Sequence, residues 1–106
     1  MIYSIHNSTN DSLECMYKKD NLKIIYRIVI PAKEKQTIFS TSKKKNERDC
    51  EKGNPLSSIE LVSIKNLTTN TSPSFNNQLN HCDQWVHERV KRYMTYTLKL
   101  KNKDFE

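Results

Sequence analysis

The sequence predicts a small α+β domain, in which an antiparallel sheet of about four to five strands carries one helix, from the C-terminal region, packed on a face. Alternating apolar runs predict the strands, and an apolar spacing of three to four residues near position 80 predicts the helix. A length of 106 residues with 35% hydrophobic content allows one domain. We therefore expect a flexible N-terminal arm (1–11), a single domain (12–101) and a short tail (102–106).

The strongest strand pattern is the run LKIIYRIVI (22–30). Alternate residues of this run share one face: Ile24, Tyr26, Ile28 and Ile30. The run LECMY (13–17) precedes it, and the polar gap KKDN between the two runs suits a hairpin loop. Pro31 ends the second strand because proline has no amide hydrogen to donate to a ladder. These residues predict an antiparallel pair at the start of the domain.

Two further strands are expected in the middle of the chain. The segment QTIFST (36–41) reads as a short third strand, although its polar flanks leave it little to bury. The segment SSIELVSIKNL (57–67) fits either a helix or a strand. The β-branched Val62 and Ile64, followed by the polar stretch 68–77, favour a strand and then a long loop. The mostly charged residues 42–55 are expected to form a solvated loop.

A helix over 78–92 followed by a strand over 94–101 is predicted for the C-terminal region. The helical stripe consists of Leu79, Cys82, Val86 and Val90. Asp83 in the first turn favours the helix dipole. After residue 92 the period changes to strict alternation, through Met94, Tyr96, Leu98 and Leu100. One long helix is the alternative, but it would place Leu98 on the polar side.

The expected core collects the inward positions of these elements. Its members are Leu13, Leu22, Ile24, Tyr26, Ile28, Ile30, Val62, Ile64, Leu79, Val86, Val90, Met94 and Leu98.

A formal net charge of +6 favours polyanionic partners such as nucleic acid, anionic lipid or glycosaminoglycan. Basic and aromatic residues of the C-terminal region form the predicted polyanion-binding site: Arg89, Lys91, Arg92, Tyr93, Tyr96, Lys99 and Lys101. A possible second basic loop consists of Lys43, Lys44, Lys45 and Arg48. The alternative is a solvated basic face with Tyr96 and Trp85 in the core.

Metal and thiol chemistry are not expected from the crowded stretch around residue 82. On a helix, His81 and Cys82 would both lie more than about 100° from His87, whereas ligands of one metal want positions three or four apart. Cys82 on the buried stripe and His87 on the opposite side would also not activate each other. We therefore expect no metal, no cofactor, no catalytic residues and no enzymatic activity.

The three cysteines, Cys15, Cys50 and Cys82, are widely spaced and odd in number. Free thiols in an intracellular (cytoplasmic or nuclear) protein fit this set, and a single disulfide would follow in an oxidising compartment. Four N-x-S/T triplets keep a secreted glycoprotein open: those of Asn7, Asn10, Asn66 and Asn70. No apolar run is long enough for a membrane span, and no secretory signal is visible.

Together these features predict a non-enzymatic small basic binding protein that contacts nucleic acid or another polyanionic surface, such as an acidic protein surface, through Lys and Arg with aromatic support. One alternative is a secreted N-glycosylated interaction module with one disulfide. The other is an orphan open reading frame with little selected function. Neither composition nor spacing predicts an oligomeric state.

Overall fold

The computed structural model describes residues 1–19, 23–40, 59–91 and 93–106. Within these ranges the chain forms strands and short 3-10 helices. The strands are β1 (Ile2–Asn7), β2 (Leu13–Lys19), β3 (Tyr26–Ile30), β4 (Lys35–Ser40), β5 (Ile59–Asn66), β6 (Trp85–Val90) and β7 (Tyr93–Leu100). The 3-10 helices are η1 (Asn76–Gln78), η2 (Cys82–Gln84) and η3 (Asn102–Phe105).

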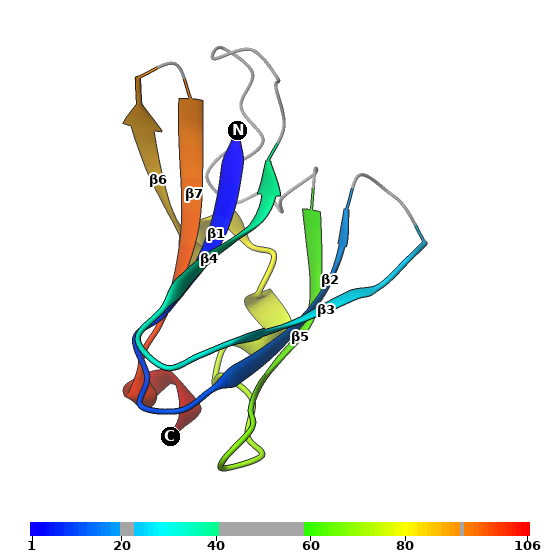
Figure 1. The fold of residues 1–106 in the computed structure, drawn as a ribbon, viewed down its shortest axis with the longest axis vertical. Helices are drawn as coiled ribbons and strands as arrows, with labels where there is room; N and C mark the ends of the chain where they lie inside the picture. Colours follow the sequence, from blue (N-terminus) through cyan, green and yellow to red (C-terminus); the bar gives the residue numbers. More distant parts are fainter. Residues whose placement is uncertain (20–22, 41–58, 92) are drawn as a thin grey trace.

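The strands make two sheets, a four-stranded sheet in the order β4-β1-β7-β6 and a three-stranded sheet in the order β3-β2-β5. Figure 1 shows them as separate layers, with the yellow segment that carries η1 and η2 between them in this view. The β1–β7 pair is parallel and the other pairs are antiparallel. No helix in the described ranges exceeds four residues, so the predicted α+β fold is wrong. The domain is mostly β.

The N-terminal segment is not the loose arm that its polar composition predicts. Residues Ile2–Asn7 form β1, which lies between β4 and β7 inside the four-stranded sheet. Tyr3 and Ile5 are fully buried, whereas the alternate residue His6 is half-buried and faces away from the core. The predicted tail also has structure, because it contains η3.

Asn7 explains why a polar residue is buried at the end of β1. Its Nδ2 donates to the carbonyl oxygens of Asp11 at 2.9 Å, Ile30 at 2.9 Å and Pro31 at 3.1 Å. Its Oδ1 accepts from both the amide and the hydroxyl of Thr9. These segments are the two corners where the chain passes between the sheets, so one amide group holds both crossings and leaves no buried polar atom unsatisfied.

All five predicted strands are confirmed as strands, with shifted ends. The hairpin of β2 and β3 is antiparallel, as expected, although β3 begins at Tyr26, later than residue 22. The segments at 36–41, 57–67 and 94–101 correspond to β4, β5 and β7. A bulge between β1 and β4 inserts Ile38 into the core.

The predicted helix over 78–92 is wrong. Its first half contains η1 and η2, and its second half is β6, which pairs antiparallel with β7. The apolar spacing fits a helix, but Val86 and Val90 lie on the outer face of β6 and are 46% and 45% exposed. Pairing with β7 satisfies the backbone of this segment, and its β-branched valines suit a strand.

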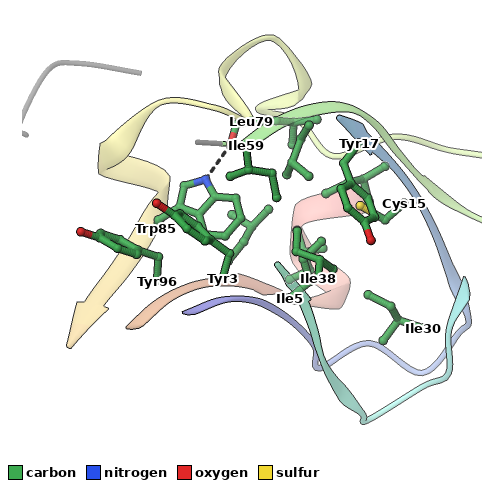
Figure 2. Packing of buried hydrophobic residues seen from close by; sticks show 14 of the residues in the cluster. Tyr3, Ile5, Cys15, Tyr17, Ile30, Ile38, Ile59, Leu79, Trp85 and Tyr96 are labelled. Atoms are coloured by element: carbon green, nitrogen blue, oxygen red, sulfur yellow. Dashed lines mark hydrogen bonds between the residues drawn. The ribbon is translucent and has the colours of Figure 1, made fainter. Parts of the chain in front are cut away.

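Side chains of the segment 79–85 anchor it between the sheets (Figure 2). The indole Nε1 of Trp85 donates to the carbonyl oxygen of Leu79 at 2.8 Å, and both residues are buried. Asn80 pairs with Leu61 on the edge strand β5, where its Oδ1 accepts from the amide and its Nδ2 donates to the carbonyl at 2.9 Å. The side chain of Asn80 therefore satisfies the edge of β5 as the backbone of a neighbouring strand would.

One buried cluster joins both sheets and this segment. Its members are Met1, Tyr3, Ile5, Leu13, Cys15, Tyr17, Ile30, Ile38, Ile59, Leu61, Ile64, Leu79, Cys82, Trp85, Tyr96, Leu98 and Leu100. Of the expected core, Leu13, Ile30, Ile64, Leu79 and Leu98 are confirmed, and Tyr26, Ile28 and Met94 pack against it half-buried. Ile24, Val62, Val86 and Val90 are instead exposed, and Leu22 lies outside the described residues.

Candidate functional site

The structure divides the predicted polyanion site between the two ends of β7. Arg89 and Lys91 lie at the turn between β6 and β7, and Lys99 and Lys101 lie at the opposite end. From Tyr93 to Lys99 the strand extends about 20 Å, at ~3.3 Å per residue. Both groups are exposed, but no single compact ligand group reaches both.

The aromatic support expected from Tyr96 is not at the surface. Tyr96 is 1% exposed, and its ring stacks on that of Tyr3 with centroids 5.0 Å apart. The burial of Tyr96 and Trp85, which the alternative interpretation expects, is therefore confirmed. Tyr93 is 50% exposed, but it lies at the turn end of β7.

Five predicted site residues cannot be placed. Arg92 and the possible second basic loop of Lys43, Lys44, Lys45 and Arg48 lie outside the described residues.

A transverse basic row crosses the outer face of the four-stranded sheet. His6 of β1 pairs with Lys35 of β4 on one side and with Lys99 of β7 on the other. Residues directly opposite each other share a sheet face, so the three side chains lie side by side over about 10 Å. Both lysines are exposed, whereas Ile5 and Leu98, which precede His6 and Lys99 in their strands, are buried on the core face.

Two more lysines extend this row at the same end of the sheet. Lys33 lies two residues before Lys35, and its Nζ donates to the carbonyl oxygen of Ser8 at 2.8 Å. Lys101 lies two residues after Lys99 and is exposed. We call the resulting set the basic patch: His6, Lys33, Lys35, Lys99 and Lys101.

No lysine of the basic patch forms a salt bridge within the described residues. Glu88 shares the outer face of the sheet, but it pairs with Thr95, four residues along β7 from Lys99. Two other carboxylates lie near the patch: Glu34 is exposed just before Lys35, and Asp104 accepts a hydrogen bond from the backbone amide of Lys101 at 2.9 Å. The patch therefore keeps an excess of positive charge, with four lysines against these two carboxylates.

The outer face of the three-stranded sheet has the opposite character. There Glu14 accepts from Nε of Arg27 at 2.7 Å and lies opposite Lys65 in the neighbouring strand. Lys18 and Glu60 face each other with Nζ 3.9 Å from the carboxylate. Each basic residue on these paired positions has an acidic neighbour. Among the described residues, these paired positions therefore differ from the basic patch, whose lysines form no salt bridge there.

The residues considered for metal and thiol chemistry do not make a reactive site. Cys82 is buried and disulfide-bonded, and its partner sulfur lies outside the described residues. The ring nitrogen Nε2 of His87 lies 3.3 Å from the carbonyl oxygen of Cys82. Nδ1 of His81 accepts from the amide of Asp83 at 3.3 Å. Within the described ranges, no group of three or more potential metal ligands occurs.

Sequence reasoning found Lys99 and Lys101 but missed His6, Lys33 and Lys35. The missing signal was the alternation in IYSIHN (2–7), where Tyr3 and Ile5 alternate with polar residues. Even with that strand recognised, the juxtaposition of β4, β1 and β7 depends on sheet order, which alternation does not specify.

In the part of the chain that the structure describes, no helix is long and apolar enough to cross a membrane. Comparisons with protein-family models, with curated proteins and with solved structures give no match. The case for a function therefore rests on the basic patch.

Proposed function

We propose that this domain binds polyanions without catalysing a reaction, and that the basic patch is the binding surface. The transverse row of Lys35, His6 and Lys99 is the observation that supports this proposal. Lys35 and Lys99 lie on either side of His6 on one face, and neither forms a salt bridge in the described residues. Exposed positive charges without a salt-bridge partner attract polyanions, so this row favours an external anion as the compensating partner.

Binding of this kind is electrostatic and depends on salt. Each lysine that neutralises an anionic group of the ligand releases condensed counterions. Four lysine contacts give a slope of about −3 to −4 in a plot of log K against log salt concentration. A lysine acts as a point charge without a fixed fork geometry, so we expect little dependence on ligand sequence.

Fluorescence anisotropy with a labelled polyanion over a series of salt concentrations tests the proposal. The Lys35→Gln/Lys99→Gln variant is expected to weaken binding and to reduce the magnitude of the salt slope by about two. The matched control is Lys18→Gln/Lys65→Gln, which removes the same charge from the three-stranded sheet and should leave the slope unchanged. Equal losses in both variants, or no binding by the parent protein at low salt, would refute the proposal.

The turn end of β7 is a second place to test, because the sequence predicted it. The Arg89→Gln/Lys91→Gln variant removes two charges there and leaves the basic patch intact. On our proposal this variant binds more tightly than Lys35→Gln/Lys99→Gln. The reverse order would assign binding to the turn between β6 and β7.

A secreted, disulfide-containing interaction module is the second candidate function. The disulfide of Cys82 favours an oxidising compartment, whereas the intracellular location inferred from cysteine spacing stays a prediction. Two sequon asparagines, Asn10 and Asn70, are exposed and open to modification. Asn7 and Asn66 are 0% and 3% exposed, and the amide nitrogen that would carry a glycan is hydrogen-bonded in both.

Expression in a secretory host with intact-mass measurement tests this candidate. The secreted, folded protein should carry at most two glycans, and Asn10→Gln and Asn70→Gln should each remove one. Secretion of folded protein with unmodified Asn10 and Asn70 would count against it.

A further inference from the structure

We infer that the polyanion bound by the basic patch is a sulfated polysaccharide and not a nucleic acid. This inference rests on the proposed function, because it names the ligand class of the same surface. Three features of the structure carry it: the lack of Phe, Tyr and Trp rings beside the patch, its lysine-rich composition and the disulfide of Cys82.

No Phe, Tyr or Trp ring accompanies the basic patch on the outer face in the described part of the chain, and the imidazole of His6 is the one ring in the patch. Tyr3, Tyr96 and Trp85 belong to the same sheet, but all three side chains are buried in the core. Tyr93 shares the outer face at the far end of β7, about 20 Å from Lys99. Proteins that bind single-stranded nucleic acid stack successive bases on several aromatic rings. A single imidazole gives the patch little of this contact.

The arrangement of the patch does not suit reading of the major groove. Readers of the major groove insert a helix or a two-stranded ribbon between the phosphate backbones. The row of Lys35, His6 and Lys99 instead lies across three neighbouring strands and does not project on a single element. Such a row can follow a flexible chain that carries a charge on each unit, as sulfated polysaccharides do.

The cations of the patch are lysines and one histidine. Arginine favours planar, bidentate contact with phosphate or with base edges, whereas lysine acts as a mobile point charge. Sulfate groups spaced along a polysaccharide need charge without a fixed fork geometry. The composition of the patch therefore agrees with a ligand recognised by charge density.

The disulfide at Cys82 is an independent indication. Disulfides persist in oxidising environments, which include the extracellular space and the lumen of the secretory pathway. Sulfated polysaccharides are polyanions of those environments, whereas most nucleic acid lies in compartments that keep thiols reduced. The cysteine chemistry and the patch chemistry thus agree on one ligand class.

A competition assay with the full chain tests the inference. The probes are a heparin-derived oligosaccharide, its desulfated counterpart of equal length, mixed-sequence single-stranded RNA, duplex DNA and vesicles containing phosphatidylserine. All are compared at one salt concentration, with Lys35→Gln/Lys99→Gln and its control Lys18→Gln/Lys65→Gln. We expect the sulfated oligosaccharide to bind at least tenfold more tightly than the other probes, and only the patch variant to lose this binding.

The outcomes separate the inference from the proposed function. Tighter, patch-dependent binding of RNA, DNA or vesicles would overturn the sulfated ligand but keep the patch as a polyanion site. Equal binding of the sulfated and desulfated oligosaccharides would also overturn the inference. Loss of binding in both variants, or no binding to any probe, would overturn the proposed function itself.

Discussion

The ring of Tyr3 stacks on the ring of Tyr96, with centroids 5.0 Å apart and planes 14° apart, although the two residues lie near opposite ends of the chain. The residues pair across the parallel strands β1 and β7, and both side chains are buried. Trp85 meets the ring of Tyr3 edge-on at 6.3 Å (Figure 2). This aromatic group fixes β1 in the core, where composition alone predicts a loose arm.

Truncation of Tyr3 tests that assignment. We expect Tyr3→Ala to lower the free energy of unfolding by about 3–5 kcal/mol, because it empties a large buried volume. Tyr93→Ala is the control, since Tyr93 is half-exposed and should change the stability by less than about 0.5 kcal/mol. Urea unfolding followed by tryptophan fluorescence measures both. An unchanged urea midpoint for Tyr3→Ala would indicate that residues 1–11 form a loose arm after all.

Substitution of Asn7 tests the polar corner at the end of β1. In Asn7→Asp a carboxylate oxygen replaces the amide nitrogen and faces three carbonyl oxygens, so donors are lost and a charge is buried. The expected loss of stability exceeds about 3 kcal/mol at neutral pH. It should shrink in acid, where the carboxyl group is protonated. Asn10→Asp, at an exposed position, is the control and should unfold like the parent protein.

Lys91 offers a stabilising change. It has a φ of 56°, a left-handed conformation that costs a residue with a side chain about 1–2 kcal/mol. Lys91→Gly removes this strain and is expected to raise the stability by up to about 1 kcal/mol. Lys65→Gly, inside β5, should instead lower the stability by about 0.5–1 kcal/mol. A thermal melt of both variants checks the predicted opposite signs.

The buried thiol of Cys15 makes stability depend on alkaline pH. Burial raises the pKa of Cys15 from 9.0 to about 12. Burial also raises the pKa of Tyr17, and the negative charges of Cys15 and Tyr26 raise it further. Between pH 9 and 12 the unfolded chain loses protons that the folded chain keeps, so stability is full below that window and falls as pH rises through it.

Urea unfolding at a series of pH values measures this effect. Cys15→Ala should make the fall in stability less steep, since it removes the group with the larger pKa shift. The parent thiol should also resist alkylation until the protein unfolds. An identical pH dependence in the parent and in Cys15→Ala would contradict the assigned cause.

Strand alternation was a reliable guide where one face is apolar and the other polar. Residues of β3 and β7 show this, with Ile30 and Leu98 inside and Arg27 and Lys99 outside. In β1 the alternation of Tyr3 and Ile5 is present, but the polar composition of residues 1–11 masked it, and the next inward position holds a polar residue, Asn7, that bonds to distant segments. Asn7 is held in place by hydrogen bonds to residues distant in the sequence, so no local sequence pattern predicts its burial.

The helix predicted over 78–92 was wrong for a different reason. Apolar residues three or four apart are common to an amphipathic helix and to a loop that leads into a strand. Leu79 and Cys82 reach the core from the loop, Trp85 reaches it from β6, and the valines that completed the helical stripe are exposed. The ambiguity is resolved by the partner strand β7, which alternation did identify.

The candidate site shows the same division. Lys99 could be predicted from composition and alternation, because it lies on the polar face of a recognisable strand. Its neighbours His6 and Lys35 could not, since they come from two other strands whose order in the sheet is set by core packing. Charge density at a surface is a property of the assembled sheet.

The position of β1 between β4 and β7 has a consequence for folding during synthesis (Figure 1). Because β1 is synthesised before β7, it acquires its parallel partner only after β7 has been made. Pairing between distant segments is slow to form, and unpaired strand edges invite contact with other chains in the interval. The four-stranded sheet is therefore completed only after β7 has been synthesised. Until then the edge of β1 that will pair with β7 is unpaired and can pair with strands of other chains.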